Sequence, residues 1–403
     1  MNLPEAAVAL LIRRDDGTDF HGPSVLLGRR ARRESDPWSG HIALPGGHPE
    51  SRDRDLMDTA LRECGEEAGI HLGRKDVVGG LPEIVAGRVT GRHVKVSPFL
   101  VVVDDFRQTS EGDGEIEEWM PFPLRDLDDP SLRRRFQAPD GSWQDALETP
   151  MGLLWGMTLR LLERTWREPM VGGIERLWLD YDGTVYPASH ELADEIDRRI
   201  TSWVAKARGL AWEDADLLRR DLYRKHGNTL RGMMREDDTD PNAYLDFVFD
   251  LPDSVFPGSD LRLRTVLEGL GLPISVFTNA RADYVRRGLG HLGLHGLVGD
   301  IHDIASFGWT AKPEPHLYDE MIRREGIRDP GSVLFVEDRA ENLAPARARG
   351  IRCVWIDENS VGDWTESEGS VWDRVPWHWK LRELADLPLL MCPHLGWNGT
   401  VPG

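Results

Sequence analysis

The sequence predicts an α/β protein with two domains, the second of which contains a parallel sheet. In the second half of the chain, short apolar runs that end in polar residues alternate with stretches of helical periodicity, as in parallel sheets covered by helices. In the first half, strand-like runs flank a segment with helical periodicity. At 403 residues the chain is also longer than one ordinary hydrophobic core, which favours two domains.

The first domain is expected over residues 1–170. Its strands are predicted at 4–14, 24–30 and 93–104, where apolar residues are bounded by turn-forming ones. Its helices are predicted at 53–69, which has apolar residues on one side and carboxylates on the other, and at 151–166, which is strongly apolar. The pair Gly172-Gly173 interrupts the pattern and is expected to mark the joint between the domains.

The second domain is expected over residues 174–360. Its strands are predicted in the runs IERLWLDYDG, ISVFTNA, SVLFVED and RCVWID. Residues 187–272, between the first two runs, are far longer than an ordinary βα loop and predict an inserted helical cap. The tail, 361–403, is rich in tryptophan; we expect it to pack on a domain, an aromatic binding surface being the alternative.

Composition restricts the partners and the compartment. The formal charge of −20 argues against a nucleic-acid duplex or an anionic membrane surface as the main partner. The cysteines Cys64, Cys353 and Cys392 are few and far apart, which fits a reducing cytoplasm. The N-terminal segment has no basic region and too short an apolar run for a signal peptide or a membrane span. A homo-oligomer is left open.

The first chemical constellation is a run of carboxylates on the helix expected at 53–69. Glu63, Glu66 and Glu67 stand at i, i+3 and i+4, so that they share one face, and Arg62 can pair with Glu66. Hard divalent cations take oxygen ligands of this kind. The alternative is a solvated acidic face, which the preceding Gly-Gly turn and the following Gly69 disfavour.

This stretch resembles the second half of the Nudix box. Arg62 to Ile70 fits R-E-U-x-E-E-x-G-U, where U is apolar, although His48 and Arg54 stand where the first half has glycine and glutamate. The coenzyme A pyrophosphatase-like branch typically has aspartates and one extra residue there, as with Asp53 and Asp55 here. The same resemblance extends to VLLGRRA, WSGHIALPGG, VSPFLVVV, EIEEWMPFPL and WGMTLRLL.

The resemblance implies an α/β/α sandwich that hydrolyses a nucleoside-linked diphosphate to two monophosphates. Glu63, Glu66 and Glu67 would bind Mg²⁺ or Mn²⁺, with Glu66 also counted as catalytic, and Arg62 would orient the helix. The base varies within this superfamily, and Glu115 and Glu118 are candidates that could equally be solvated loop acids. GHIALPGG departs from the GQVSFPGG-like stretch of that branch, so coenzyme A is not specified as the substrate.

The second constellation consists of polar residues at the ends of predicted strands. Asp180 and Asp182 follow the first strand, and Gly183 permits a turn that brings both carboxylates together. The others follow in chain order: Thr278, Asn279, Lys312, Glu337 and Asp338. The carboxyl ends of parallel strands meet at one edge, where such sheets place their sites.

Together these residues resemble the four motifs of the haloacid dehalogenase (HAD) superfamily, over about residues 174–357, and imply a Rossmann-like phosphatase. Asp180 would form an aspartyl phosphate and Asp182 would serve as acid and base. Thr278 would hold a phosphoryl oxygen and Lys312 would offset negative charge. Metal binding is assigned to Asp180, Asp182 and Asp338, with Glu337 behind them; Asn279 and Gly183 are assigned to substrate binding.

Within that superfamily, pyrimidine 5′-nucleotidase-like members are the most similar, through LDYDGTVYP, HGNTLRGMM, FTNA and VEDRAENLAPARARG. HGNTLRGMM lies in the expected cap. His226, Asn228, Thr229 and Arg231 are therefore candidates for substrate selection, of which Thr229 and Arg231 are assigned to substrate binding; cap packing is the alternative.

The two resemblances together predict a bifunctional Mg²⁺-dependent hydrolase of a small nucleotide derivative, in which one domain makes phosphomonoesters and the other consumes them. Coenzyme A, dinucleotides, ADP-ribose, sugar nucleotides and pteridine triphosphates remain open as substrates. The alternative is a HAD phosphatase regulated by a nucleotide-sensing, non-catalytic Nudix domain. Two unrelated fused activities are a third reading.

Overall fold

The computed structural model describes residues 3–13, 23–33, 38–87, 91, 93–107, 112–138, 140–167, 171–357 and 379–391. The chain divides into two compact units, one formed mainly by residues 1–172 and the other by 173–359 and 371–387. Cys392 and the tail tryptophans other than Trp379 lie outside the described residues. Among the described residues, no helix has the length and apolarity needed to cross a bilayer.

The first unit is built on a mixed sheet whose central pair is parallel. β1 (Glu5–Arg13) pairs with β7 (Val94–Val103) along its whole length, from Glu5 opposite Lys95 to Arg13 opposite Val103. The strand order is β3-β2-β1-β7-β5, with β4, β6 and β8 attached to β1, β7 and β2. The bounds are β2 (Ser24–Arg30), β3 (Ile42–Ala43), β4 (Gly46–Gly47), β5 (Val77–Gly80), β6 (Ile84–Ala86) and β8 (Ile116–Pro123).

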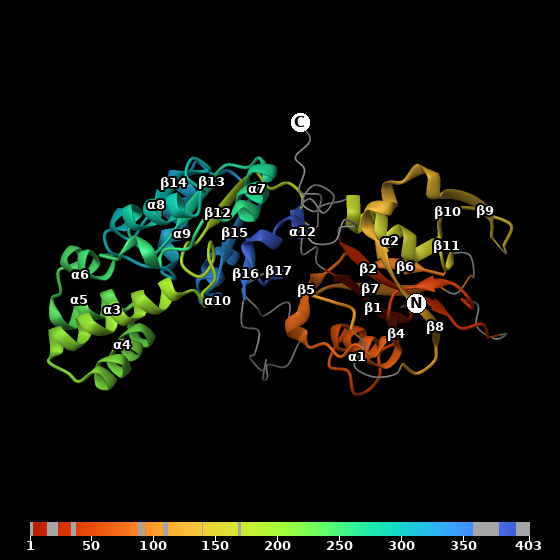
Figure 1. Ribbon diagram of the computed structural model, residues 1–403, viewed down its shortest axis with the longest axis horizontal. Coiled ribbons are helices and arrows are strands. Elements are labelled where there is room, and N and C mark those ends of the chain that lie inside the picture. The colour runs from red at the N-terminus through yellow and green to blue at the C-terminus, as the bar shows by residue number, and fades with distance from the viewer. Residues whose placement is uncertain are drawn as a thin grey trace. The chain divides into compact units, whose positions relative to one another are not determined.

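Two helices lie on opposite faces of this sheet, α1 (Leu56–Ala68) against β1 and α2 (Gly156–Arg167) on the other side (Figure 1). The α/β/α arrangement expected for this domain is therefore confirmed. A separate antiparallel sheet contains β9 (Arg133–Gln137), β10 (Trp143–Thr149) and β11 (Gly152–Trp155).

The helix predicted over 151–166 is wrong in its first turn, because that segment is β11. Gly152 opposite Thr149 closes a tight hairpin with β10. Gly156, at φ 70°, then reverses the chain into α2. A short apolar run such as Leu153 to Trp155 suits a strand as well as a helix, so periodicity alone cannot decide between them.

The second unit contains a six-stranded, wholly parallel sheet in the order β14-β13-β12-β15-β16-β17. The four predicted strands are β12 (Arg176–Leu179), β13 (Ile274–Phe277), β15 (Val333–Glu337) and β16 (Arg352–Ile356). The sequence prediction missed the edge strands β14 (Val298–His302) and β17 (Trp379–Leu381). The parallel-sheet α/β fold expected for this half is confirmed.

The core around the central strands of this sheet is aromatic. Trp178 packs edge-on against Phe277 and Phe335, with 6.4 Å between the ring centroids in each case, so the three central strands share one packing unit. Three helices connect the central strands to their neighbours: α8 (Ala282–His291), α9 (Pro315–Arg324) and α10 (Ala340–Arg347). These buried contacts fix the strand ends that carry the site.

Helices fill most of the segment expected to form the cap. Figure 1 shows a helix group gathered beside the sheet, made of α3 (Glu191–Arg208), α4 (Trp212–His226), α5 (Thr229–Asp237) and α6 (Pro241–Val248). α7 (Leu261–Leu270) packs elsewhere, against the turn at Leu384–Asp386, where Arg262 is 2.6 Å from Glu383 and 3.2 Å from Asp386. Residues 187–272 therefore contain a helix group and one helix of the sheet domain.

A matched pair of glycines in α8 tests the packing around Tyr181. A Cβ on Gly288 would lie 1.7 Å from the Tyr181 hydroxyl oxygen, whereas a Cβ on Gly290 would meet nothing within 4 Å. We expect Gly288→Ala to lower the free energy of unfolding by about 1–3 kcal/mol through overpacking. Gly290→Ala should leave it unchanged or raise it by up to about 0.5 kcal/mol. Equal effects in thermal unfolding would contradict this packing.

Candidate active sites

The first site lies at the carboxyl ends of three adjacent strands of the parallel sheet. Asp180 follows β12, Thr278 follows β13 and Glu337 ends β15. Because β12 pairs with both β13 and β15 in parallel, these three residues emerge at one edge. The structure therefore brings together residues that are far apart in the sequence.

Lys312 holds the acidic residues together. Its Nζ lies 2.9 Å from Asp180 Oδ1 and 2.6 Å from Glu337 Oε2, and it donates to the Phe277 carbonyl at 2.7 Å. Lys312 and Glu337 are 1% and 0% exposed, so this ion pair is shielded from water. A buried ammonium with three acceptors is fully satisfied. Lys312 therefore has one fixed position.

Asn279 fixes the backbone of Lys312. The Lys312 N–H donates to Asn279 Oδ1 at 2.8 Å, and Asn279 Nδ2 donates to the Lys312 carbonyl at 3.2 Å. These two bonds occupy the amide of Asn279, a predicted substrate-binding residue. Thr278 is 2% exposed, and its hydroxyl accepts the Ala280 N–H at 3.0 Å. Both residues thus shape the loop after β13.

Asp338 has the features of a cation ligand. Its Oδ1 is buried and has no hydrogen-bond partner among the described residues. Asp180, Glu337 and Asp338 each offer one oxygen, and these atoms all lie within 4.8 Å of one another. Gly183, at φ 76°, leaves room for this arrangement, because a Cβ there would lie 2.5 Å from Asp338 Oδ2.

The acidic cluster carries more negative charge than Lys312 can offset. Burial, together with the charge of Glu337, raises the pKa of Asp180 to about 7. Burial likewise raises the pKa of Glu337 to about 7, against the opposing effect of Lys312, and that of Asp338 to about 6. Three carboxylates beside one ammonium, all with oxygen donors, fit a hard divalent cation.

Asp182 is held by two tyrosines that the sequence analysis missed. Asp182 Oδ1 accepts from the Tyr186 hydroxyl at 2.6 Å and from the Tyr284 hydroxyl at 2.7 Å. Burial raises the pKa of Asp182 to about 6, while these hydrogen bonds lower it. Tyr186 stands within the LDYDGTVYP motif, but Tyr284 is 102 residues from Asp182, so no local pattern could have paired them.

The residues proposed for substrate selection in HGNTLRGMM have internal partners. Asn228 caps α5 by accepting the Leu230 N–H at 2.9 Å. His226 lies 3.1 Å from Glu236, another residue of the helix group. Both side chains thus have partners within the helix group, which is the packing role that was the alternative to substrate selection.

The two remaining residues of this motif differ in where they point. Thr229 is buried and donates to the Arg219 carbonyl at 3.4 Å, within the helix group. Arg231 forms an ion pair with Glu314, two residues after Lys312. Arg231 therefore links the helix group to the loop that carries Lys312.

The second site is the carboxylate face of α1. Asp55 caps the start of this helix by accepting the Met57 and Asp58 N–H groups, so the helix begins three residues later than predicted. Gly69, at φ 65°, ends it. Glu67 is 4% exposed and accepts the Gly46 N–H at 2.9 Å. A Cβ on Gly47 would lie 2.3 Å from Glu63 Oε1, so the Gly-Gly strand lets the helix approach closely.

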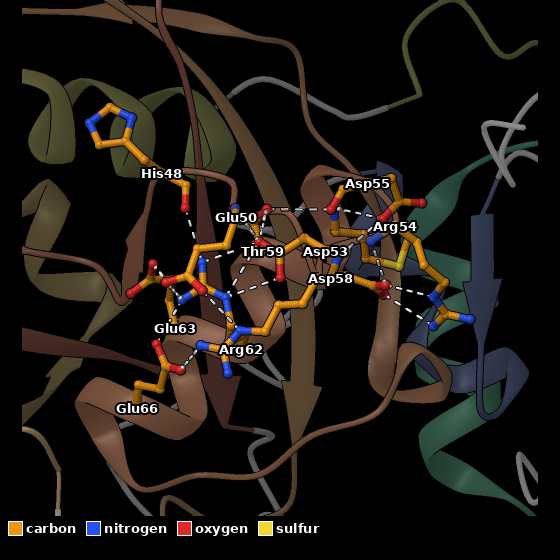
Figure 2. A network of polar contacts seen from close by, with 12 residues as sticks. His48, Glu50, Asp53, Arg54, Asp55, Asp58, Thr59, Arg62, Glu63 and Glu66 are labelled. Atoms are coloured by element: carbon orange, nitrogen blue, oxygen red, sulfur yellow. Dashed lines mark hydrogen bonds and ion pairs between the residues drawn. The ribbon is translucent and has the colours of Figure 1, made fainter.

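Arg62 is the centre of the polar network on α1 (Figure 2). Its Nη1 lies 2.9 Å from Glu63 Oε1 and 2.6 Å from Glu66 Oε2. Its Nε lies 3.0 Å from Asp53, and its Nη2 donates to the His48 carbonyl at 3.0 Å. Arg62 therefore ties the segment before α1 to two of the three predicted metal ligands.

The third predicted ligand, Glu67, is separate from this network and has a strongly shifted pKa. Burial raises the pKa of Glu67 to about 8, and the nearby Glu63 charge adds to the effect, while the Gly46 N–H opposes it. Burial also raises the pKa of Glu63 despite Arg62. Buried carboxylates are costly to ionise without a nearby cation, and their oxygen atoms are the ligands that hard divalent cations prefer.

The two candidate bases lie on different sides of β2. Arg30 Nη2 is 3.3 Å from Glu115, and Arg30 Nη1 is 3.9 Å from Glu67. The neighbouring Arg29, whose side chain alternates to the other face, is instead 2.9 Å from Glu118. Glu115 is therefore the candidate that shares a partner with the α1 carboxylates.

Family comparisons agree with the two sites. Residues 3–143 match the model of the NUDIX domain, and residues 177–350 match that of the haloacid dehalogenase-like hydrolases. An uncharacterised protein of Schizosaccharomyces pombe is 32% identical over 148 residues, which is 33% of this chain and 45% of that protein. The uncharacterised Nudix hydrolase NudL of Pectobacterium atrosepticum is 31% identical over 102 residues, 25% of this chain and 50% of that protein.

The chain thus spans about half the length of the curated relatives it matches. Among solved structures, a HAD phosphatase from Thermococcus onnurineus aligns at 18% identity with a TM-score of 0.38, covering 53% of this chain and 96% of that one. The NUDIX domain of Shewanella oneidensis NrtR, complexed with ADP ribose, aligns at 18% identity with a TM-score of 0.26, covering 32% and 77%. At these scores neither likeness bears on function.

The resemblances predicted from the sequence are confirmed at the level of these two families, both of which generally depend on divalent metals. The chain carries an N-terminal Nudix domain and a C-terminal haloacid dehalogenase-like hydrolase domain.

Proposed function

We propose that the chain is a bifunctional, divalent-metal-dependent hydrolase of small nucleotide derivatives. Its Nudix domain cleaves a diphosphate to monophosphates, and its HAD domain removes phosphate from a monophosphate through an aspartyl phosphate. The observation that carries the proposal is the cluster of Asp180, Lys312, Glu337 and Asp338. The buried ammonium of Lys312 bridges the carboxylates of Asp180 and Glu337, and Oδ1 of Asp338 has no hydrogen-bond partner in the described part of the chain. Such a cluster suits phosphoryl transfer, which depends on positioning and on charge stabilisation.

In the HAD domain, Asp180 is the proposed nucleophile. Lys312 binds Oδ1 of Asp180, which favours its ionised form and leaves Oδ2 to attack phosphorus. Asp182 protonates the leaving oxygen and then takes a proton from the water that hydrolyses the aspartyl phosphate. Asp180, Asp338 and the backbone of Asp182 would hold Mg²⁺, with Glu337 behind them; when bound, the ion stabilises negative charge on the phosphoryl group.

In the Nudix domain, Glu63, Glu66 and Glu67 would hold Mg²⁺ or Mn²⁺, which when bound stabilises charge on the diphosphate and acidifies water. Arg62 orients Glu63 and Glu66 through its two short contacts. Glu115 is the proposed base, because Arg30 holds it beside Glu67. The Asp113 N–H donates to the Glu66 carbonyl at 2.8 Å, which ties the loop that carries Glu115 to the end of α1.

A specific observation favours a second candidate function, in which the Nudix domain senses a nucleotide without cleaving it. Among the described residues, Asp180, Glu337 and Asp338 form the only group of three possible metal-binding side chains whose ligand atoms all lie within 4.8 Å of one another. Glu63 and Glu66 are instead engaged by Arg62, and Glu66 is also 2.5 Å from Arg52. On this reading, the ligand would rearrange the Arg62 network and so regulate the phosphatase.

One pair of variants separates the two activities. We expect Asp180→Asn to lower the kcat for nucleoside monophosphates by about a thousandfold or more while diphosphate cleavage continues, because it removes only the HAD nucleophile. Glu67→Gln should do the reverse. Each activity is measured on its own substrate with Mg²⁺. If Glu67→Gln leaves diphosphate cleavage unchanged, the carboxylate face of α1 does not catalyse that reaction. The sensing function holds if the wild-type protein cleaves no diphosphate and Glu67→Gln changes the effect of added nucleotides on the phosphatase rate.

A second pair identifies the Nudix base. Glu115→Gln should lower the kcat for diphosphate cleavage by about 10²–10⁴-fold, the usual contribution of a general base. Glu118→Gln is the matched control, with the same change three residues away and on the Arg29 side of β2, and should change kcat by less than about threefold. The assignment is wrong if Glu118→Gln has the larger effect or if the two variants are equal.

A further inference from the structure

Two tyrosine hydroxyls and one carboxylate form a closed triangle beside the proposed nucleophile. Tyr186 and Tyr284 both donate to Oδ1 of Asp182, and their own hydroxyl oxygens are 3.3 Å apart. Among the described residues, these hydroxyls are the hydrogen-bond donors to the Asp182 carboxylate, and both act on the same oxygen. The carboxylate therefore has one held oxygen and one oxygen, Oδ2, that is left for chemistry.

The two tyrosines are themselves immobilised by packing. Both are buried, and each ring packs edge-on against the ring of Tyr181, at centroid distances of 5.4 Å and 5.5 Å. Phe249, which follows α6 of the helix group, stacks on Tyr284 at 4.3 Å with an interplanar angle of 21°. Two donors fixed in this way hold an acceptor more tightly than solvent would, because they lose little freedom when they bond.

We infer that Tyr186 and Tyr284 are positioning residues that orient Oδ2 of Asp182 toward the leaving oxygen of the ester. The inference rests on the proposed function and adds to it the residues that orient its acid. When the Asp180–phosphorus bond forms and the phosphorus–oxygen ester bond breaks, its electron pair stays on the leaving oxygen. Asp182 Oδ2 gives that oxygen its proton, so that a neutral alcohol leaves rather than an alkoxide.

The need for this proton depends on the leaving group. An alkoxide is a poor leaving group, so hydrolysis of a nucleoside or sugar monophosphate requires the acid. A nitrophenolate leaves readily as an anion, so p-nitrophenyl phosphate requires it far less. A variant in which Asp182 is misoriented therefore slows the hydrolysis of alkyl esters selectively. General damage to the site slows the hydrolysis of both ester classes alike.

The test compares kcat/KM for a nucleoside 5′-monophosphate and for p-nitrophenyl phosphate in Tyr186→Phe, Tyr284→Phe and Asp182→Asn. We expect each Phe variant to lose about tenfold or more on the nucleotide and less than about threefold on p-nitrophenyl phosphate, with Asp182→Asn showing the same selectivity more strongly. The hydrolysis of p-nitrophenyl phosphate also reports that the variants are folded.

Tyr181→Phe is the matched control, because the Tyr181 hydroxyl is buried in the same aromatic group but has no hydrogen-bond partner among the described residues. It should keep the wild-type ratio of the two substrates. Equal losses on both substrates in the Phe variants, no loss in either, or the same selectivity in Tyr181→Phe would overturn the inference while leaving the phosphatase function in place. A wild-type protein that hydrolyses neither ester would instead remove the proposed function itself.

Discussion

Both sites depend on one electrostatic constraint: carboxylates are held close together by rigid elements, with too few cationic side chains to neutralise them. In the HAD domain, parallel strand ends place Asp180, Glu337 and Asp338 around a single buried ammonium, Lys312. In the Nudix domain, α1 places Glu63 and Glu66 beside Arg62, and the cation nearest to Glu67 among the described residues is Arg30, at 3.9 Å. Ionising such groups costs free energy, and a bound divalent cation would supply the positive charge that the fold lacks.

The helix group and the sheet edge of the HAD domain are coupled through this site. Arg231 pairs with Glu314 next to the Lys312 loop, and Tyr223 of α4 accepts from Arg339, the residue after Asp338, at 2.9 Å. Phe249 stacks on Tyr284, which holds Asp182. Of the residues of HGNTLRGMM that were predicted to select substrate, Arg231 is the one whose ion pair reaches the loop that carries Lys312.

The sequence predicted those features that depend on local pattern and on parallel strand order. Asp180, Thr278 and Asp338 were predictable because apolar runs mark the strands, and parallel strands bring their ends to one edge. The role of Tyr284 was not predictable, because its contact with Asp182 depends on packing between distant segments. The different partners of Glu115 and Glu118 were not predictable either, because they depend on side-chain direction. The strand β11 was missed because a short apolar run has no decisive period.

The most direct test of the charge constraint is the thermal unfolding midpoint of metal-free and Mg²⁺-loaded protein at about pH 5 and about pH 8. Burial raises the pKa values of Asp180 and Glu337 to about 7 and that of Asp338 to about 6 in the folded state. The folded state therefore binds more protons than the unfolded state in this interval, so the metal-free HAD transition should fall as pH rises. Saturating Mg²⁺ should raise it by roughly 5–10 °C at the higher pH and much less at the lower, and Asp338→Asn should abolish the rise. A metal-free midpoint that increases with pH, or a Mg²⁺ effect that is equal at both pH values, would contradict the account.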